Sequence, residues 1–166
     1  GVCTMDIALA DLAEHTHINL GIFAATLGSI DPRRDGDMFT VLVDGTELLH
    51  VGFGFGNDQG FSEPLAHAPR INGVSVAPSL FDAVRTLSYV NAGWDQYAYD
   101  LGQLDAFGMI PHTSDTLAIS IIGRSNQGWS NEAYGVDNIS VELVPEPATV
   151  MMLGLGALGL LRRRRA

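Results

Sequence analysis

The chain has 166 residues, of which 46% are hydrophobic and 17% charged, so it accommodates one folded domain with a short appendage and is not an acidic disordered chain. Nineteen acidic residues outnumber nine basic ones, all of them arginine, and the net charge of −10 excludes binding to the phosphate backbone of nucleic acids. The single cysteine, Cys3, excludes an intrachain disulfide and a zinc site built from several cysteines.

The body of the chain alternates between apolar and polar residues, which is the pattern of half-buried β-strands. The alternating runs are, in chain order, residues 18–22, 39–43, 49–55, 117–121 and 139–143. Asp44-Gly45 separates two of these runs and predicts a tight β-hairpin. The segment 79–89 fits a short helix or a crossing strand equally well. About seven to nine short strands of this kind predict an all-β antiparallel sandwich.

The C-terminus carries a different pattern, which predicts a single membrane-spanning helix. Its parts are the box Pro145, Glu146 and Pro147, the apolar run 148–161, and the arginines Arg162, Arg163, Arg164 and Arg165. As a helix the apolar run spans about 21 Å, and arginine side chains that reach the lipid interface make up much of the difference from a hydrocarbon core of about 30 Å. Because arginines remain on the cytoplasmic side, we expect residues 1–144 to lie outside the cytoplasm.

This C-terminal segment resembles the PEP-CTERM sorting signal of Gram-negative bacteria, in which a Pro-Glu-Pro box, a short hydrophobic helix and a terminal arginine cluster follow one another. Residues 144–166 have these parts in this order. The resemblance implies recognition by a membrane-embedded exosortase and removal of the helix near the box. It also implies export to the envelope surface or to the extracellular matrix, where polysaccharide is a further candidate partner.

Two stretches of the body resemble exported bacterial jelly-roll domains. Residues 37–48 are similar to their D-x-F-x-V-x-V-D-G-x-x-L hairpin, and residues 132–139 to the E-x-W-G-I-D-N-V last strand of lectin-like, concanavalin-type sandwiches. Tyr134 stands where the second pattern has tryptophan. The resemblance implies a jelly-roll or lectin-like β-sandwich over residues 1–143. Such domains have a further N-terminal strand, so we expect that strand and an export signal to precede Gly1.

Asp137 is the acidic residue with the clearest structural expectation. It shares the parity of Val141 and Leu143 on the last predicted strand, which places it on the core-facing side. A buried carboxylate needs a cation or several N–H donors. One interpretation is a calcium site formed by Asp137, Asn138 and Glu132 with nearby carbonyl oxygens. The alternative is that Asp137 caps a neighbouring loop through backbone N–H groups.

Four aromatic residues are candidates for a platform on which sugar rings stack: Trp94, Tyr97, Tyr99 and Trp129. Parity places Tyr97 and Tyr99 on one face of a strand and Trp94 on the other, whereas Trp129 follows in a loop rich in Gly, Ser and Asn. The alternative is that at least one of these sets fills the core, as aromatic residues most often do.

Two clusters of polar residues are expected to lie at the protein surface. His15 and His17 lie two residues apart and could form half of a zinc site, but the sequence offers no third ligand at a suitable spacing, which favours a surface pair. Asp31, Asp35 and Asp37 do not follow the spacing of an EF-hand, and we expect a solvated loop with exposed ion pairs.

The sequence contains no G-x-S-x-G, H-E-x-x-H or P-loop motif. We therefore expect a non-enzymatic envelope or matrix protein that binds glycans, with calcium as a structural ion. The first alternative is a polysaccharide-acting enzyme, a glycoside hydrolase or lyase, which would need two carboxylates across a groove. The second alternative is a purely structural surface protein without a small ligand.

Overall fold

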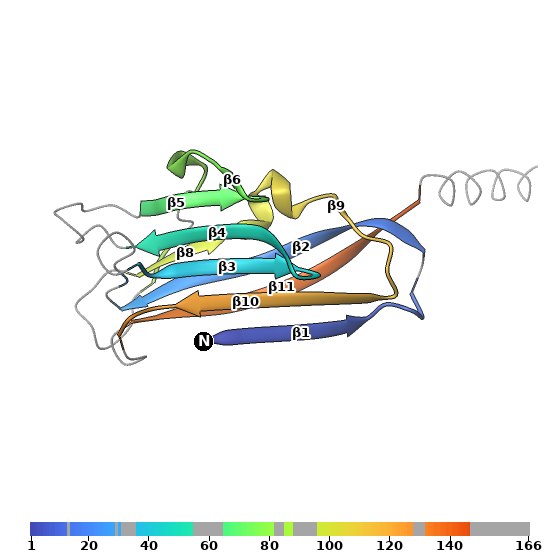
Figure 1. Ribbon diagram of the computed structural model, residues 1–166, viewed down its shortest axis with the longest axis horizontal. Coiled ribbons are helices and arrows are strands. Elements are labelled where there is room, and N and C mark those ends of the chain that lie inside the picture. The colour runs from blue at the N-terminus through green and yellow to red at the C-terminus, as the bar shows by residue number, and fades with distance from the viewer. Residues whose placement is uncertain are drawn as a thin grey trace, which may run out of the picture.

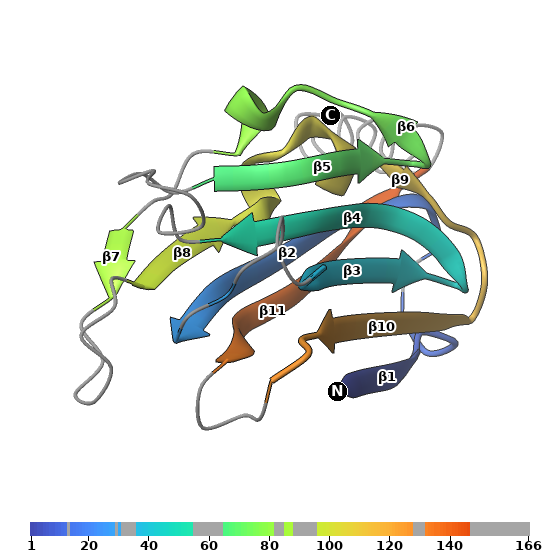
Figure 2. The ribbon, with the colours of Figure 1, turned by 60° about the vertical axis from the view of Figure 1, so that its left-hand side comes forward.

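The computed structural model describes residues 1–12, 14–28, 30, 36–54, 65–81, 85–87, 96–127 and 132–146. Most of these residues are in β-strands, which form two antiparallel sheets around one hydrophobic core (Figure 1). Figure 2 shows the sheet with β3, β4 and β10 in front of the sheet with β2 and β11. This arrangement confirms the prediction of an all-β fold.

The first sheet has six strands in the order β1-β10-β3-β4-β5-β6. Their bounds in this order are Val2–Ala8, Thr116–Arg124, Met38–Val43, Thr46–Gly54, Leu65–Ile71 and Val74–Ser75. The turn between β3 and β4 is the predicted hairpin at Asp44-Gly45, where Val43 pairs with Thr46. Asp44 and Gly45 have φ angles of 49° and 77°, and positive φ at both central residues suits the twist of a two-residue hairpin.

The second sheet has the order β11-β2-β8-β7, with β9 paired to β2 beside this path. The strands run over Glu132–Pro145 (β11), His15–Gly28 (β2), Gln96–Asp100 (β8), Arg85–Leu87 (β7) and Ile110–Pro111 (β9). Short 3₁₀ turns at Pro78–Leu80 (η1), Leu101–Gln103 (η2) and Asp105–Phe107 (η3) connect the elements. The ambiguous segment 79–89 thus contributes part of a 3₁₀ turn and the short strand β7.

The strand β1 is an element that the sequence analysis does not identify. It pairs with β10 along its whole length, from Val2 opposite Ile122 to Ala8 opposite Thr116. Only Met5 and Ile7 are half-buried, and the other side chains of β1 are exposed. A strand at the edge of a sheet that covers so little of the core needs no strong apolar signal.

One core fills the space between the two sheets. Its largest fully buried side chains come from both layers and include Phe39, Phe53, Leu49, Leu117, Ile119, Ile18, Leu20, Ile22 and Tyr99. Phe53 stacks on Tyr99 with ring centroids 4.1 Å apart. The centroids of Phe81 and Phe39 lie 5.8 and 5.9 Å from that of Phe53. Phe53 therefore joins aromatic rings from both sheets.

Candidate functional site

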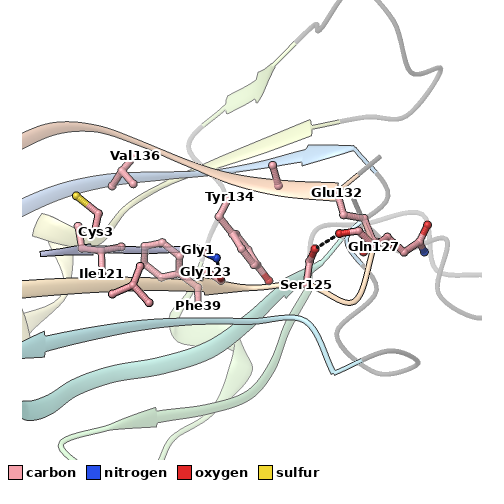
Figure 3. A pocket seen from close by; sticks show the side chains of 12 residues that line it. Gly1, Cys3, Phe39, Ile121, Gly123, Ser125, Gln127, Glu132, Tyr134 and Val136 are labelled. Atoms are coloured by element: carbon pink, nitrogen blue, oxygen red, sulfur yellow. Dashed lines mark hydrogen bonds between the residues drawn. The ribbon is translucent and has the colours of Figure 1, made fainter. Parts of the chain in front are cut away.

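A pocket of about 440 Å³ opens at one edge of the sandwich, between β1 and β10 of the first sheet and β11 of the second (Figure 3). Among the described strands, β1 and β11 are the last members of their sheets on this side. The space between the layers is therefore open here. Its lining combines the apolar side chains of Phe39, Ile121 and Val136 with the polar residues Ser125 and Gln127.

Tyr134 on β11 provides the aromatic surface of this edge pocket. Its ring packs against Phe39 with centroids 5.5 Å apart, and its hydroxyl donates to the backbone oxygen of Phe53 at 3.3 Å. On the side of the loop after β10, the Ser125 hydroxyl donates to the backbone oxygen of Gln127 at 3.0 Å (Figure 3). The pocket thus has an aromatic wall next to a polar rim.

Two buried carboxylates lie near Tyr134, which local sequence patterns do not reveal. Asp37 is 0% exposed and Glu132 is 1% exposed. The Asp37 carboxylate accepts a hydrogen bond from the backbone N–H of Asn126 at 3.2 Å, so the expectation of a solvated loop is wrong for this residue. Burial raises the pKa of the Tyr134 phenol, and the nearby carboxylates of Asp37 and Glu132 raise it further. The phenol therefore stays protonated and acts as a donor.

The three predicted calcium ligands do not form one site. Glu132 is buried at the start of β11, whereas Asp137 and Asn138 are exposed. Glu132 and Asp137 are five residues apart on one strand, a separation of about 17 Å. Within the described ranges, no group of three or more His, Cys, Asp and Glu side chains is placed to hold a metal ion.

The prediction that Asp137 faces the core is wrong because β11 contains a bulge. Asp137 pairs with Phe23 and Ser140 with Gly21, so β11 has one residue more than β2 in this interval. The extra residue reverses the alternation of inward and outward side chains along β11. Val141 and Leu143 therefore face the core, whereas Asp137 does not. The Asp137 carboxylate instead accepts the N–H of Asn138 at 2.8 Å.

The predicted aromatic platform is also corrected by the structure. Tyr97 and Tyr99 on β8 are only 8% and 2% exposed, so their rings belong to the core and do not face solvent. This confirms the alternative that one of the aromatic sets fills the core. Trp94 and Trp129 lie outside the described residues.

A buried histidine pair lies at the far end of β11 from the edge pocket. The rings of His15 and His112 stack with centroids 5.1 Å apart, and His15 Nε2 lies 2.8 Å from His112 Nδ1. His112 Nε2 faces two acceptors, the Thr116 carbonyl oxygen at 3.1 Å and an Asp44 carboxylate oxygen at 3.4 Å. His112 Nε2 therefore acts as a donor, and a second hydrogen bond joins His112 Nδ1 to His15 Nε2. The expected surface pair of His15 and His17 is wrong for His15, which is 8% exposed.

Replacing His112 by alanine is expected to lower the free energy of unfolding by about 2 kcal/mol, because it leaves buried hydrogen-bonding groups without their partner. Urea denaturation followed by circular dichroism measures this loss. His17→Ala is the matched control, since His17 is half-buried and its ring bonds only to the adjacent Thr16 hydroxyl among the described contacts. Equal losses in the two variants would contradict a structural role for the histidine pair.

The predicted sorting signal begins at the same end of the molecule. Pro145 is the last residue of β11 and lies opposite His15 on β2, and Glu146 is half-buried. Pro147, the run 148–161 and the arginines at 162–165 lie outside the described residues. Within the parts of the chain that the structure describes, no helix has the length and apolar content needed to cross a membrane.

Comparison with known proteins identifies the C-terminal segment. Residues 143–165 match the family model of the PEP-CTERM protein-sorting motif, as the resemblance implies. No curated protein and no solved structure matches the chain. The motif indicates export from a Gram-negative cell and sorting by an exosortase. The chain is therefore an exported, envelope-associated protein that carries a PEP-CTERM sorting motif.

Proposed function

We propose that the β-sandwich is a non-enzymatic envelope or matrix module that binds a neutral glycan in the edge pocket. The observation that carries this proposal is the pocket, whose volume of about 440 Å³ lies in the range of about 300–1,000 Å³ common for ligand sites. The half-buried ring of Tyr134 offers aromatic surface, and Ser125 and Gln127 offer polar groups. A sugar presents both an apolar face and hydroxyl groups, which this mixed lining complements.

The charge of the chain favours a neutral ligand over an anionic one. Residues 1–143 contain eighteen acidic residues and five arginines. The buried carboxylates of Asp37 and Glu132 add negative potential close to the pocket. An anionic polysaccharide would be repelled by this field, whereas a neutral glycan would not.

Affinity electrophoresis over a panel of neutral and anionic glycans tests the proposal with the full chain in a detergent without a sugar headgroup. We expect the folded protein to be retarded by at least one neutral glycan. The substitution Val136→Trp places a large ring at the pocket, because Val136 is 40% exposed and lines it, and should abolish the retardation. Val74→Trp is the matched control on β6, where Val74 is 66% exposed, and should leave the retardation unchanged.

Three results would overturn this proposal. Unchanged migration on every glycan would favour a purely structural surface protein. Equal retardation of both tryptophan variants would place binding outside the edge pocket. Release of new reducing ends from a polysaccharide would favour the polysaccharide-acting enzyme. Repeating the retardation with calcium and with a chelator then shows whether a divalent cation takes part.

A further inference from the structure

The sorting motif overlaps the folded sandwich. The match begins at residue 143, whereas β11 continues to Pro145, so residues 143–145 belong to both the motif and the sheet. In the ladder between β11 and β2 these residues lie opposite Ile18, His17 and His15, respectively. Leu143 also packs against the core. The first proline of the Pro-Glu-Pro box is therefore joined to the domain without an intervening linker.

The start of β2, which pairs with residues 143–145, is also hydrogen-bonded on the side away from β11. The His15 ring is hydrogen-bonded to the His112 ring, and the backbone N–H of His112 donates to the Thr16 carbonyl oxygen at 3.0 Å. His17 pairs with Pro111 of β9 on the side opposite β11. The start of β2 thus lies between β11 and the segment that contains β9 and His112. Separation at this ladder is expected to occur by departure of β11, the strand with only one neighbour among the described strands.

We propose that the exosortase engages the motif only after residues 143–145 have separated from β2, so that the folded sandwich restricts its own processing. A processing enzyme needs the backbone and side chains of its recognition sequence, and here the backbone is paired and Leu143 is packed inward. The last rungs of a strand at a sheet edge open at a small fraction of the cost of global unfolding. The step is therefore accessible, and its frequency limits the rate of processing. This inference is independent of the proposed glycan binding.

A reversible covalent lock tests the separation step. Directly opposite residues in an antiparallel pair have Cα atoms about 4.5–5.5 Å apart, within the range that a disulfide spans. The double substitution His17→Cys and Val144→Cys, made with Cys3→Ser, places cysteines at one such pair. In a Gram-negative host with an exosortase, pulse–chase immunoblotting of the full chain measures conversion of precursor to processed protein. We expect conversion to be at least about tenfold slower in the oxidised form and to recover on reduction.

Two control variants show whether a slower reaction depends on where the disulfide is placed. Thr4→Cys with Ser120→Cys, in the same Cys3→Ser background, places a disulfide between β1 and β10, where the two native hydroxyl oxygens are 3.1 Å apart. This lock should not slow processing, because it leaves β11 free to separate. The single substitution Val144→Cys shows whether the motif tolerates the change. Equal processing rates for the oxidised and reduced forms of the lock at residues 17 and 144 would overturn the proposal.

A linker variant tests the same step without a disulfide. A short Gly/Ser insertion between Glu142 and Leu143 moves residues 143–145 away from β2 while keeping the matched motif together. Processing should become several times faster, because the box no longer depends on separation of the strand. The same insertion in the turn at Asn72-Gly73, between β5 and β6, is the control and should leave the rate unchanged. An insertion before Leu143 that fails to accelerate processing would show that separation does not limit the rate and would overturn the proposal.

Discussion

Replacing Phe53 by alanine is expected to lower the free energy of unfolding by about 3–5 kcal/mol, the loss typical of a fully buried phenylalanine. The Phe53 side chain is 0% exposed and contacts rings from both sheets. The centroid of its ring is 4.1 Å from that of Tyr99 and 5.8 Å from that of Phe81. Truncation therefore leaves a cavity at the point where the two layers meet. Urea denaturation followed by circular dichroism measures the change.

The matched control for this substitution is Phe23→Ala. Phe23 lies on β2 and is half-buried, so its truncation should cost less than about half as much as that of Phe53. Phe53→Leu keeps most of the volume and should fall between the two alanine variants. Losses of similar size for Phe53→Ala and Phe23→Ala would contradict the central position of Phe53 in the core.

The strands with one buried face and the tight hairpin could be predicted from local sequence patterns. The alternation of apolar residues in β2, β3, β4 and β10 reflects burial of one face, and this burial is visible in the sequence. Asp44-Gly45 predicts its hairpin because few residues adopt positive φ at two successive positions. In β1 the inward residues Met5 and Ile7 are only half-buried, so the selection for apolar residues is weak there.

The failure at Asp137 shows how a single extra residue defeats a parity argument. Even-numbered residues such as Tyr134 face inward before the bulge, and Val141 and Leu143 face inward after it. Asn138 within the bulge has φ of 51°, a conformation that asparagine adopts more readily than most residues. Asparagine in the middle of a predicted strand was therefore a signal that the alternation could break.

The buried polar groups could not be predicted because their partners are distant in sequence. His15 and His112 are 97 residues apart, and Asp37 and Asn126 are 89 residues apart. The spacing of neighbouring residues contains no information about such pairs, which depend on how the two sheets are stacked. The sorting segment is the opposite case. Its parts follow one another along the chain, so the segment can be identified from the sequence without knowledge of the tertiary structure.

Raising the pH from 9 to 11 is expected to lower the free energy of unfolding by roughly 3 kcal/mol, because burial keeps the phenols of Tyr99 and Tyr134 protonated in the folded chain. Burial raises the pKa of Tyr99 and of Tyr134 well above the ordinary value of about 10. Above pH 10 the unfolded chain therefore releases protons from these groups while the folded chain keeps them. Alkali thus stabilises the unfolded state, and stability falls by about 1.4 kcal/mol per pH unit for each phenol.

Phenylalanine substitutions separate this titration from other effects of alkali. Tyr99→Phe removes a hydroxyl that has no hydrogen-bond partner within the described part of the chain, and it should remove about half of the pH-dependent loss. Tyr134→Phe loses the bond to the Phe53 carbonyl oxygen at every pH and should remove the other half of the slope. Urea denaturation at a series of pH values between 8 and 11 measures both effects. If the double variant lost stability as steeply as the native chain, the alkaline loss would have to come from groups other than these two phenols.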